Sequence, residues 1–315
     1  MKTGSEKDTG HRGNRQSHER NLSLFTGPTP TTCTLYPYTL YPFGGMETEL
    51  AGIKIVLVEP AGALNVGSVA RVMKNMGLRH LTLVNPQCDP LGGEARQMAV
   101  HAVDLLEAAI QVPTLPEALQ DCQRSIATTG RSHTTLDITL ESPRSALPWL
   151  LESTTSADSP TAALIFGRED HGLTNEELNY AQRFIQIPSS AAYRSLNLAQ
   201  AVAICCYELH TWALESLPRL LTNKTSVPTT PEIQQAMKSP ELASLGALEG
   251  YYQQLEKLLL KIGYLYPHTA ASRMEKIRRV FNRSYPSVDE VAMMRGMIRQ
   301  MEWALREKAR STPEA

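Results

Sequence analysis

Short apolar runs alternate with helical patterns from residue 53 onward, and this alternation is typical of α/β proteins. The runs are strand-sized, rich in β-branched residues and bounded by Pro, Gly or Asn, as expected of buried parallel strands. The sequence therefore predicts a sheet of five or six parallel strands. Five of them are placed at residues 53–59, 81–84, 125–129, 162–166 and 184–187.

The segments between these runs show the periodicity of amphipathic helices. Asn65 precedes the first helix as its expected N-cap, and Gly77 follows it as a C-terminal cap. Thr174 and Glu177 have the spacing of a capping box. Helices are predicted at residues 66–76, 94–109, 175–182 and 197–215, and later in the chain at 241–261, 271–282 and 288–309.

The pattern divides the chain into four parts. Residues 1–50 mix Ser, Thr, Pro, Gly and Arg without periodicity, so we expect a disordered N-terminal arm. An α/β domain over residues 51–215 precedes a Pro-, Thr- and Ser-rich linker over residues 216–240 and a small helical domain over residues 241–315. Met46 stands just before the first organised segment, so an over-long start is an alternative for the arm. An organelle transit peptide is less favoured because acidic residues interrupt it.

Composition narrows the functional classes. The 315 residues carry a formal net charge of -1, so any basic surface for nucleic acid must be local. The five cysteines include no C-x-x-C pair, which argues against a disulfide framework or a zinc ribbon and favours a reducing compartment. No apolar run is long enough to span a membrane, and no His, Cys and Asp cluster has the spacing of a metal site. We therefore expect a cytoplasmic protein with neither metal nor membrane.

Chemistry is concentrated in three segments that follow predicted strands. In the first, the apolar stripe of the helix should leave Gly67 and Arg71 on its open face, so that Arg71 passes over Gly67 toward the strand ends. The second, residues 166–173, is a charged turn between two glycines. The third, residues 187–201, places Ser, Tyr and Arg ahead of Asn197 at a helix start. Taken singly, each could be a capped helix or a polar surface turn.

Together and in order, the three segments resemble motifs 1, 2 and 3 of the SpoU/TrmH family of SPOUT methyltransferases. The matching residues are Asn-x-Gly-x-x-x-Arg at 65–71, Phe-Gly-x-Glu-x-x-Gly-Leu-Thr-Asn-Glu-Glu-Leu at 166–178 and Ile-Pro-(x)6-Ser-Leu-Asn-Leu-Ala-x-Ala-Val at 187–202. The strand contexts and the C-terminal helices are similar to the TrmJ-like branch. The resemblance covers residues 51–305 and leaves only the arm unexplained.

The resemblance implies a parallel α/β sheet with a deep C-terminal trefoil knot that holds S-adenosylmethionine through the backbone of three loops. It also implies a homodimer whose sites are completed across the interface. Carried over to this sequence, the cofactor-binding positions are Thr128, Thr129, Gly130, Gly167, Ile187, Arg194, Ser195 and Leu196.

The implied reaction moves a methyl group to a ribose 2′-hydroxyl of RNA. The resemblance assigns the catalytic role to Arg71, with Asn65, Glu169, Ser195 and Asn197 orienting it and the ribose. A 2′-hydroxyl is a poor nucleophile until its proton leaves, and the family usually treats the arginine as the base. Because a guanidinium keeps its proton in proteins, we favour a clamp that holds a neighbouring phosphate and stabilises the alkoxide.

A basic stripe in the C-terminal domain predicts contacts with RNA phosphates, although a solvated helix face is the alternative. It consists of Arg273, Lys276, Arg278, Arg279 and Arg283. Nearby tyrosines either stack on unpaired bases or are buried between helices; they are Tyr251, Tyr264 and Tyr266.

The TrmJ-like branch implies tRNA as the substrate, methylated at the cytidine or uridine of position 32. Ribosomal RNA, another tRNA position, and a catalytically silent RNA-binding protein of the same fold are the alternatives. A dehydrogenase would need a G-x-G-x-x-G turn after the first strand, but the turn reads AGALNVGS. An esterase would need a G-x-S-x-G elbow, which the sequence lacks.

We predict that residues 1–45 are dispensable, because their composition is that of a disordered segment and Met46 precedes the organised part. A chain that begins at Met46 should keep the melting temperature and the methylation rate of the full protein. A loss of either would assign the arm a role.

Overall fold

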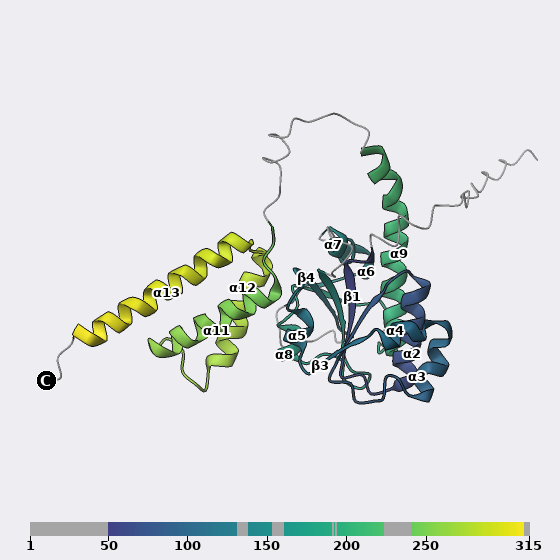
Figure 1. The fold of residues 1–315 in the computed structure, drawn as a ribbon, viewed down its shortest axis with the longest axis horizontal. Coiled ribbons are helices and arrows are strands. Elements are labelled where there is room, and N and C mark those ends of the chain that lie inside the picture. Colours follow the sequence, from purple (N-terminus) through teal and green to yellow (C-terminus); the bar gives the residue numbers. More distant parts are fainter. Residues whose placement is uncertain are drawn as a thin grey trace, which may run out of the picture. The chain divides into compact units, whose positions relative to one another are not determined.

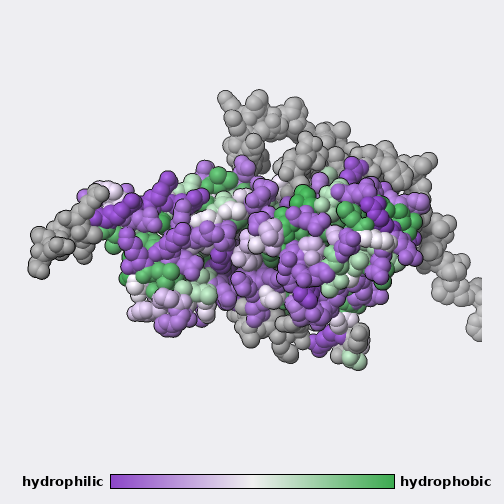
Figure 2. All heavy atoms as spheres, turned by 60° about the horizontal axis from the view of Figure 1, so that its bottom comes forward, coloured by the Kyte–Doolittle hydropathy of each residue, from purple (hydrophilic) through white to green (hydrophobic). Residues whose placement is uncertain are grey.

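The computed structural model describes residues 50–130, 138–152, 161–190, 192, 194–223 and 241–311. Side chains are described up to residue 216 in the stretch 194–223 and up to residue 307 in the stretch 241–311. The expected N-terminal arm lies outside the described residues except for its last residue, Leu50, which is buried in the core and so belongs to the α/β domain; the linker beyond residue 223 also lies outside them. No helix within the described stretches is long and apolar enough to cross a membrane. On the face drawn in Figure 2, apolar residues form separate groups within a largely hydrophilic surface.

A parallel sheet forms the centre of the α/β domain, and its strand order over the described residues is β3-β2-β1-β6-β4-β7-β5 (Figure 1). Each neighbouring pair is parallel. The five predicted strands are confirmed, whereas β3 and β5 went unpredicted because these edge strands are too short to show a period. The strands are β1 (Ile53–Val58), β2 (His80–Val84), β3 (Ile110–Val112), β4 (Arg124–Thr128), β5 (Leu140–Glu141), β6 (Ala162–Phe166) and β7 (Arg183–Ile185).

Helices cover both faces of this sheet, and residues of β1 alternate between the two cores. Ile55 and Leu57 pack with α2, α3 and α9 on one face, whereas Val56 and Val58 pack with α5 and α8 on the other (Figure 1). This two-sided burial explains why the central strands read as continuous apolar runs. The helical segments are α2 (Ala63–Asn75), α3 (Gly93–Ala99), η1 (Val100–Ala102), α4 (Val103–Glu107), α5 (Leu115–Leu119), α6 (Pro143–Ala146), α7 (Pro148–Leu151), α8 (Asn175–Leu178) and α9 (Leu198–Asn223).

Three of the predicted helices differ from the observed ones in continuity or in where they end. The helix expected over 94–109 is broken into α3, η1 and α4, with Val100 in a left-handed conformation at the break. The helix expected over 175–182 ends at Leu178. Helix α9 continues to Asn223, so residues 216–223 of the expected linker are helical. Hydrophobic periodicity does not detect the break near Val100 or the end at Leu178, because apolar residues continue past both points. Residues 216–223 were assigned to the linker because they contain Pro218 and precede a Pro- and Thr-rich stretch.

The predicted caps are confirmed at two places. Thr174 and Glu177 form a reciprocal capping box at the start of α8. Gly77 has a positive φ after α2, and the amide of Leu78 bonds back to the carbonyl of Met73, which completes a Schellman-type ending.

Two expectations for α2 are wrong. Helix α2 begins at Ala63 with Gly62 at the N-cap position, so Asn65 lies inside the first turn and does not cap the helix. Gly67 is buried, because α2 packs there against the backbone of α3. Close packing, rather than a path for Arg71, therefore explains this glycine.

The C-terminal helices form their own core and attach to the α/β domain through α11 and α12. Tyr251, Tyr252 and Leu258 are buried in this core. The backbone amide of Leu245, at the start of α11, donates a 2.7 Å hydrogen bond to the carbonyl of Cys122. The predicted helices are confirmed with small shifts as α11 (Leu245–Lys261), α12 (Ala270–Ser284) and α13 (Val288–Ser311).

Replacing Gly67 by Ala should lower the free energy of unfolding by about 1–3 kcal/mol, because the added Cβ overlaps the Ala95 carbonyl. Gly296→Ala in α13 is the matched control, since no atom lies within 4 Å of its Cβ position. That change should be neutral or stabilise by up to about 1 kcal/mol. Urea denaturation of both variants measures the difference, and equal stabilities would contradict the packing role of Gly67.

Candidate cofactor pocket and motif network

One pocket lies where β4, β6 and β7 end, and all the predicted cofactor-binding residues line it. The carboxyl ends of parallel strands are the usual ligand site of an open α/β sheet. Strand β4 leads into Thr128, strand β6 into Gly167, and strand β7 into Ile187. The pocket is lined by Thr128, Thr129, Gly130, Gly167, Ile187, Arg194, Ser195 and Leu196, together with Phe166, Arg168, Glu169, Ile185, Leu198 and Ala201.

Backbone contacts fix the shape of this pocket. The amide of Thr129 donates a 2.9 Å hydrogen bond to the carbonyl of Ile185, which ties the loop after β4 to the end of β7. A Cβ at Gly167 would overlap the backbone of Gly172 and Leu173, so only glycine allows this turn to close. The pocket therefore has a fixed shape, and both apolar and polar residues line it.

A chain of side-chain hydrogen bonds joins the three sequence motifs. Glu169 of the second motif accepts a 2.8 Å bond from Nδ2 of Asn65 in the first. Asn65 in turn accepts a 2.9 Å bond from Nδ2 of Asn197 in the third. Asn197 then caps α9, because its Oδ1 accepts from the amide of Ala199 at 2.9 Å. The structure thus brings together three of the five predicted catalytic residues.

The Glu169 carboxylate is fully engaged by donors. Besides Asn65, it accepts 3.0 Å bonds from the backbone amides of Ala61 and Gly62. Partial burial raises the pKa of Glu169, but the Ala61 amide, Asn65 and the Gly62 amide outweigh burial and hold the pKa below its ordinary value. Glu169 is therefore charged at neutral pH and anchors the turn after β1, and its lowered pKa makes it a weak general base.

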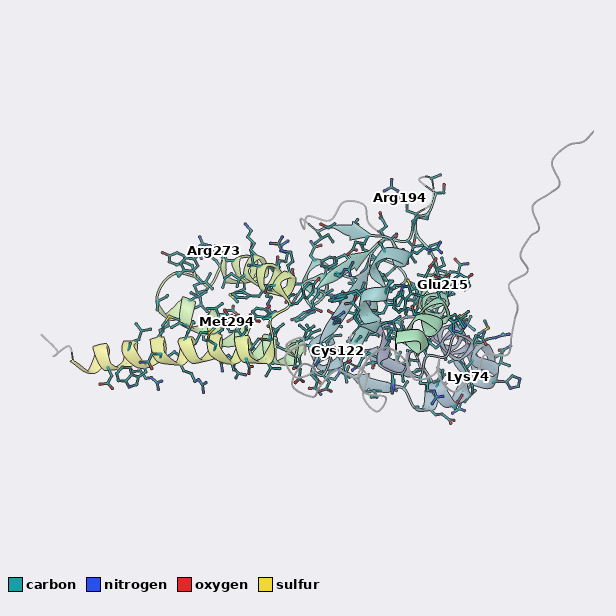
Figure 3. All side chains as sticks on the ribbon, turned by 90° about the horizontal axis from the view of Figure 1, so that it is seen from above. Lys74, Cys122, Arg194, Glu215, Arg273 and Met294 are labelled. Atoms are coloured by element: carbon teal, nitrogen blue, oxygen red, sulfur yellow. The ribbon has the colours of Figure 1, made fainter. Side chains whose placement is uncertain are left out.

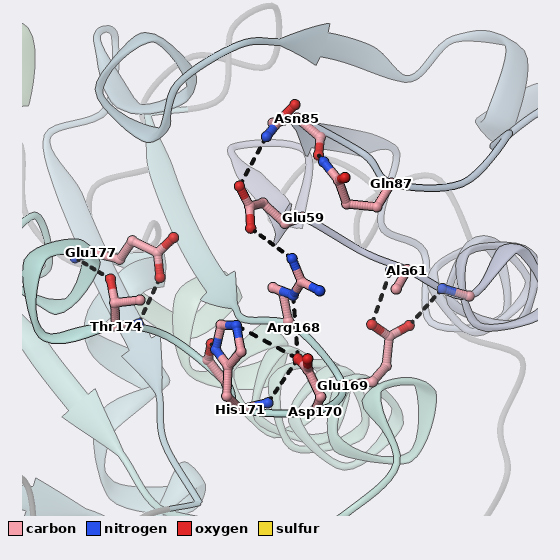
Figure 4. A network of polar contacts seen from close by, with 12 residues as sticks. Glu59, Ala61, Asn85, Gln87, Arg168, Glu169, Asp170, His171, Thr174 and Glu177 are labelled. Atoms are coloured by element: carbon pink, nitrogen blue, oxygen red, sulfur yellow. Dashed lines mark hydrogen bonds and ion pairs between the residues drawn. The ribbon is translucent and has the colours of Figure 1, made fainter.

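A second network, which the sequence analysis missed, fixes the charged turn after β6 (Figure 4). Arg168 donates 3.1 Å and 3.2 Å bonds to Glu59 and Asp170, and Asn85 donates a 2.9 Å bond to Glu59. Glu59 and Asn85 directly follow β1 and β2, and both have positive φ values. Such strained backbone is held only where the surroundings determine it. The sequence signal was the pair of polar residues that ends two apolar strands.

The other predicted catalytic residues lie apart from this chain of bonds. Ser195 is exposed and lines the cofactor pocket. Arg194, beside it, extends from the loop before α9 (Figure 3). Arg71 is exposed on α2, is absent from the pocket lining, and makes no hydrogen bond or ion pair with the described residues. The single chain therefore does not bring Arg71 to the pocket.

The five basic residues of α12 fall into three groups. Arg278 is turned into the protein, where it pairs with Glu249 and stacks over Tyr252 and Tyr180 at 4.7 Å and 5.6 Å. Arg273 instead bonds the carbonyl of Tyr264 and is labelled on the outside of the helical domain in Figure 3. The remaining three, Lys276, Arg279 and Arg283, line a groove.

The three tyrosines also differ. Tyr251 is buried in the helical core, whereas Tyr264 and Tyr266 are more than half exposed. Only the latter two are therefore accessible to a base.

Within the described residues, no three His, Cys, Asp or Glu side chains are placed to hold a metal ion.

Comparison with known proteins places the chain in a family. The SpoU rRNA Methylase family matches residues 52–207, and the C-terminal domain of the tRNA methyltransferase TrmJ matches residues 246–313. The chain therefore belongs to the SpoU methylase family of RNA methyltransferases.

Within this family, the chain is similar to proteins called TrmJ. It is 38% identical over 261 residues to the tRNA (cytidine/uridine-2'-O-)-methyltransferase TrmJ of Pectobacterium atrosepticum, a match that covers 80% of this chain and 98% of that protein. A tRNA (cytidine/uridine/adenosine-2'-O-)-methyltransferase TrmJ of Pseudomonas aeruginosa is 37% identical and is covered to 93%, against 79% of this chain. The crystal structure of TrmJ from Z. mobilis aligns with a TM-score of 0.65 and 27% identity over 79% of this chain and 98% of that one.

Glu169→Gln should destabilise the protein at neutral pH, because the amide NH₂ of Gln would face one of three hydrogen-bond donors. The folded-state pKa of Glu169 is lowered, so its stabilising contribution is present above its unfolded pKa and is lost as the pH falls through the folded value. The stability difference between wild type and variant should therefore shrink below about pH 4. Denaturation at pH 7 and pH 3.5 measures it; a gap that does not depend on pH would contradict the anchor role.

Proposed function

We propose that this protein is an S-adenosylmethionine-dependent tRNA methyltransferase that methylates the 2′-hydroxyl of a cytidine or uridine, at position 32 as the TrmJ resemblance implies. The observation that carries the proposal is that three distant segments meet in one pocket at the strand ends. Membership in the SpoU family and the names of the TrmJ relatives support the reaction and the substrate. We place the reaction in the cytoplasm.

The pocket fits the proposed cofactor by its chemistry. Apolar side chains such as Ile187 and Leu198 can cover a purine ring, and the backbone around Thr129 and Gly130 offers polar groups to its edge. S-adenosylmethionine, when bound, supplies an electrophilic methyl group on a sulfonium. The role of the chain is to hold that group in place and to exclude water from it.

Arg71 is the residue we assign to the acceptor. It is exposed on α2, outside the pocket of its own chain, and is free of intramolecular partners among the described residues. We therefore propose that the enzyme is a homodimer in which Arg71 of one protomer serves the pocket of its partner. There its guanidinium can hold a phosphate next to the ribose and stabilise the negative charge that develops on the 2′-oxygen. That oxygen takes the methyl group from the sulfonium, S-adenosylhomocysteine leaves, and the hydroxyl proton passes to solvent water.

The hydrogen bonds that join Asn65, Glu169 and Asn197 position the loops around the pocket. Glu169 holds the turn from which α2 begins, and Asn197 holds the start of α9 against the same turn. Both are positioning residues, because their polar atoms are occupied by the protein itself. Ser195 lines the pocket on its exposed side and is the residue we propose to contact the ribose.

Incubation of the purified protein with unmodified tRNA and S-adenosylmethionine tests the proposed function. Mapping 2′-O-methyl groups in the product should show one modified pyrimidine in the anticodon loop. A protein that binds the cofactor but leaves every ribose unmodified would overturn the methyltransferase assignment. Methylation of ribosomal RNA instead would overturn only the substrate.

Arg71→Ala should lower turnover by about 10²-fold or more, the scale of losing one preorganised charged donor, with cofactor affinity unchanged. Arg71→Lys tests the role of the charge. A clamp that needs the guanidinium fork leaves the Lys variant weak at every pH, whereas a base gives activity that rises with pH. Wild-type turnover in Arg71→Ala would refute the catalytic assignment.

Mixed dimers test the proposed sharing between protomers. Ala201→Phe should fill the pocket and abolish cofactor binding while leaving Arg71 intact. Mixing this variant with Arg71→Ala should restore activity, because each mixed dimer contains one complete site. If Arg71 instead serves its own pocket, neither site in the mixed dimer is complete, and the mixture stays inactive.

A further inference from the structure

A groove of about 570 Å³ runs between α12 and the β7–β5 edge of the sheet. One wall carries Lys276, Arg279 and Arg283, which recur at helical spacing on one face of α12. The other wall includes Arg183 and Phe184 of β7. The groove is separate from the cofactor pocket, but both are lined by β7: Ile185, two residues after Arg183, belongs to the pocket. At about 3.3 Å per residue, the two sites lie within roughly 10 Å along that strand.

The charge of this groove, which we call the α12 groove, is positive and uncompensated. No acidic side chain among the described residues pairs with Lys276, Arg279 or Arg283. The acidic residue of the opposite wall, Glu141, is already neutralised by a bidentate ion pair with Arg183. Lys276 and Arg283 are exposed and Arg279 is half-buried, so all three can reach a ligand without disturbing the core. Three free cations in a concave site attract a polyanion.

Buried contacts hold α12 in place against the sheet domain. On the face opposite the groove, Arg278 pairs with Glu249 and lies over Tyr180. Asn282 accepts a 2.8 Å bond from the Tyr252 hydroxyl and donates a 3.2 Å bond to the carbonyl of Asn179. Because Arg278 and Asn282 are engaged in these contacts, Arg278 is unavailable to a ligand. The groove is thus a preformed site with a fixed spacing between its cations.

We propose that the α12 groove binds the phosphodiester backbone of the RNA substrate. Binding at this site comes from Lys276, Arg279 and Arg283 together with the sheet edge, while Arg278 only positions the helix. This inference rests on the proposed function for the identity of the RNA, and it adds the place where RNA is held beside the pocket. Binding should depend steeply on salt and little on sequence, since phosphates carry no base information.

The sharpest test adds a charge to the groove without removing a cation. Val280 lines the groove and is 56% exposed, so its replacement leaves the core intact. Val280→Glu should weaken binding of an unmodified tRNA transcript about tenfold at 0.15 M salt, whereas the neutral Val280→Gln of nearly equal shape should stay within about twofold. Equal affinities of the Glu and Gln variants would overturn the proposal.

A second test removes the cations. The triple variant Lys276→Ala, Arg279→Ala, Arg283→Ala should weaken tRNA binding at least tenfold and reduce the slope of log K against log salt by about 2 to 3, at roughly 0.7–0.9 per lost phosphate contact. The control removes three exposed cations elsewhere in the helical domain, Lys257→Ala, Lys261→Ala and Arg299→Ala. The same loss in the control would show a diffuse charge effect and refute a groove.

These binding assays also separate the two proposals. The assays measure affinity and do not require catalytic activity. A protein that fails to methylate tRNA but binds it through the groove would refute only the proposed methyltransferase function. If the wild type methylates tRNA and the groove variants keep both its KM and its affinity, then only the groove falls. Melting temperature and S-adenosylmethionine affinity should be unchanged in every variant, which excludes unfolding as the cause.

Discussion

The hydrogen bonds that join Asn65, Glu169 and Asn197 are the constraint on which the site depends. Their donors and acceptors come from three loops that are far apart in the chain. A carboxylate that accepts three hydrogen bonds stays charged and cannot move without leaving donors unpaired. One half-buried anion therefore fixes the start of α2, the turn after β6 and, through the two asparagines, the start of α9.

This arrangement divides the work between positioning and chemistry. Glu169 and Asn197, two of the motif residues that the resemblance assigns to orienting Arg71 and the ribose, have their polar atoms occupied by the protein itself. Arg71 and Ser195, by contrast, are exposed and unencumbered among the described residues. An exposed arginine outside its own pocket has a reason to be there if a second protomer supplies the pocket. The exposed position of Arg71 is the observation that supports the proposed dimer.

A similar division holds for α12. Opposite faces of this helix carry cations with different roles. Arg278 is paired and stacked inside the protein, while Lys276, Arg279 and Arg283 line the groove. The inward contacts keep the helix rigid, and this rigidity keeps the outward charges at a fixed spacing. A basic stripe read from sequence alone treats all five residues as equal, because spacing does not show which faces are covered.

The sequence by itself determined the five central strands, the capping box at Thr174 and the order of the three motifs, because these features depend on local period and on neighbouring residues. It missed β3 and β5, which are too short to show a period and form only by pairing with β2 and β7. It also misplaced Asn65 as a cap and left Gly67 open, since both depend on a contact with a distant segment. The tertiary structure alone decided that Asn65 bonds Glu169 instead of its own helix, and that Arg278 is internal. When a side chain has two possible hydrogen-bond partners, the tertiary fold decides which of them lies within reach. The neighbouring residues in the sequence do not contain this information.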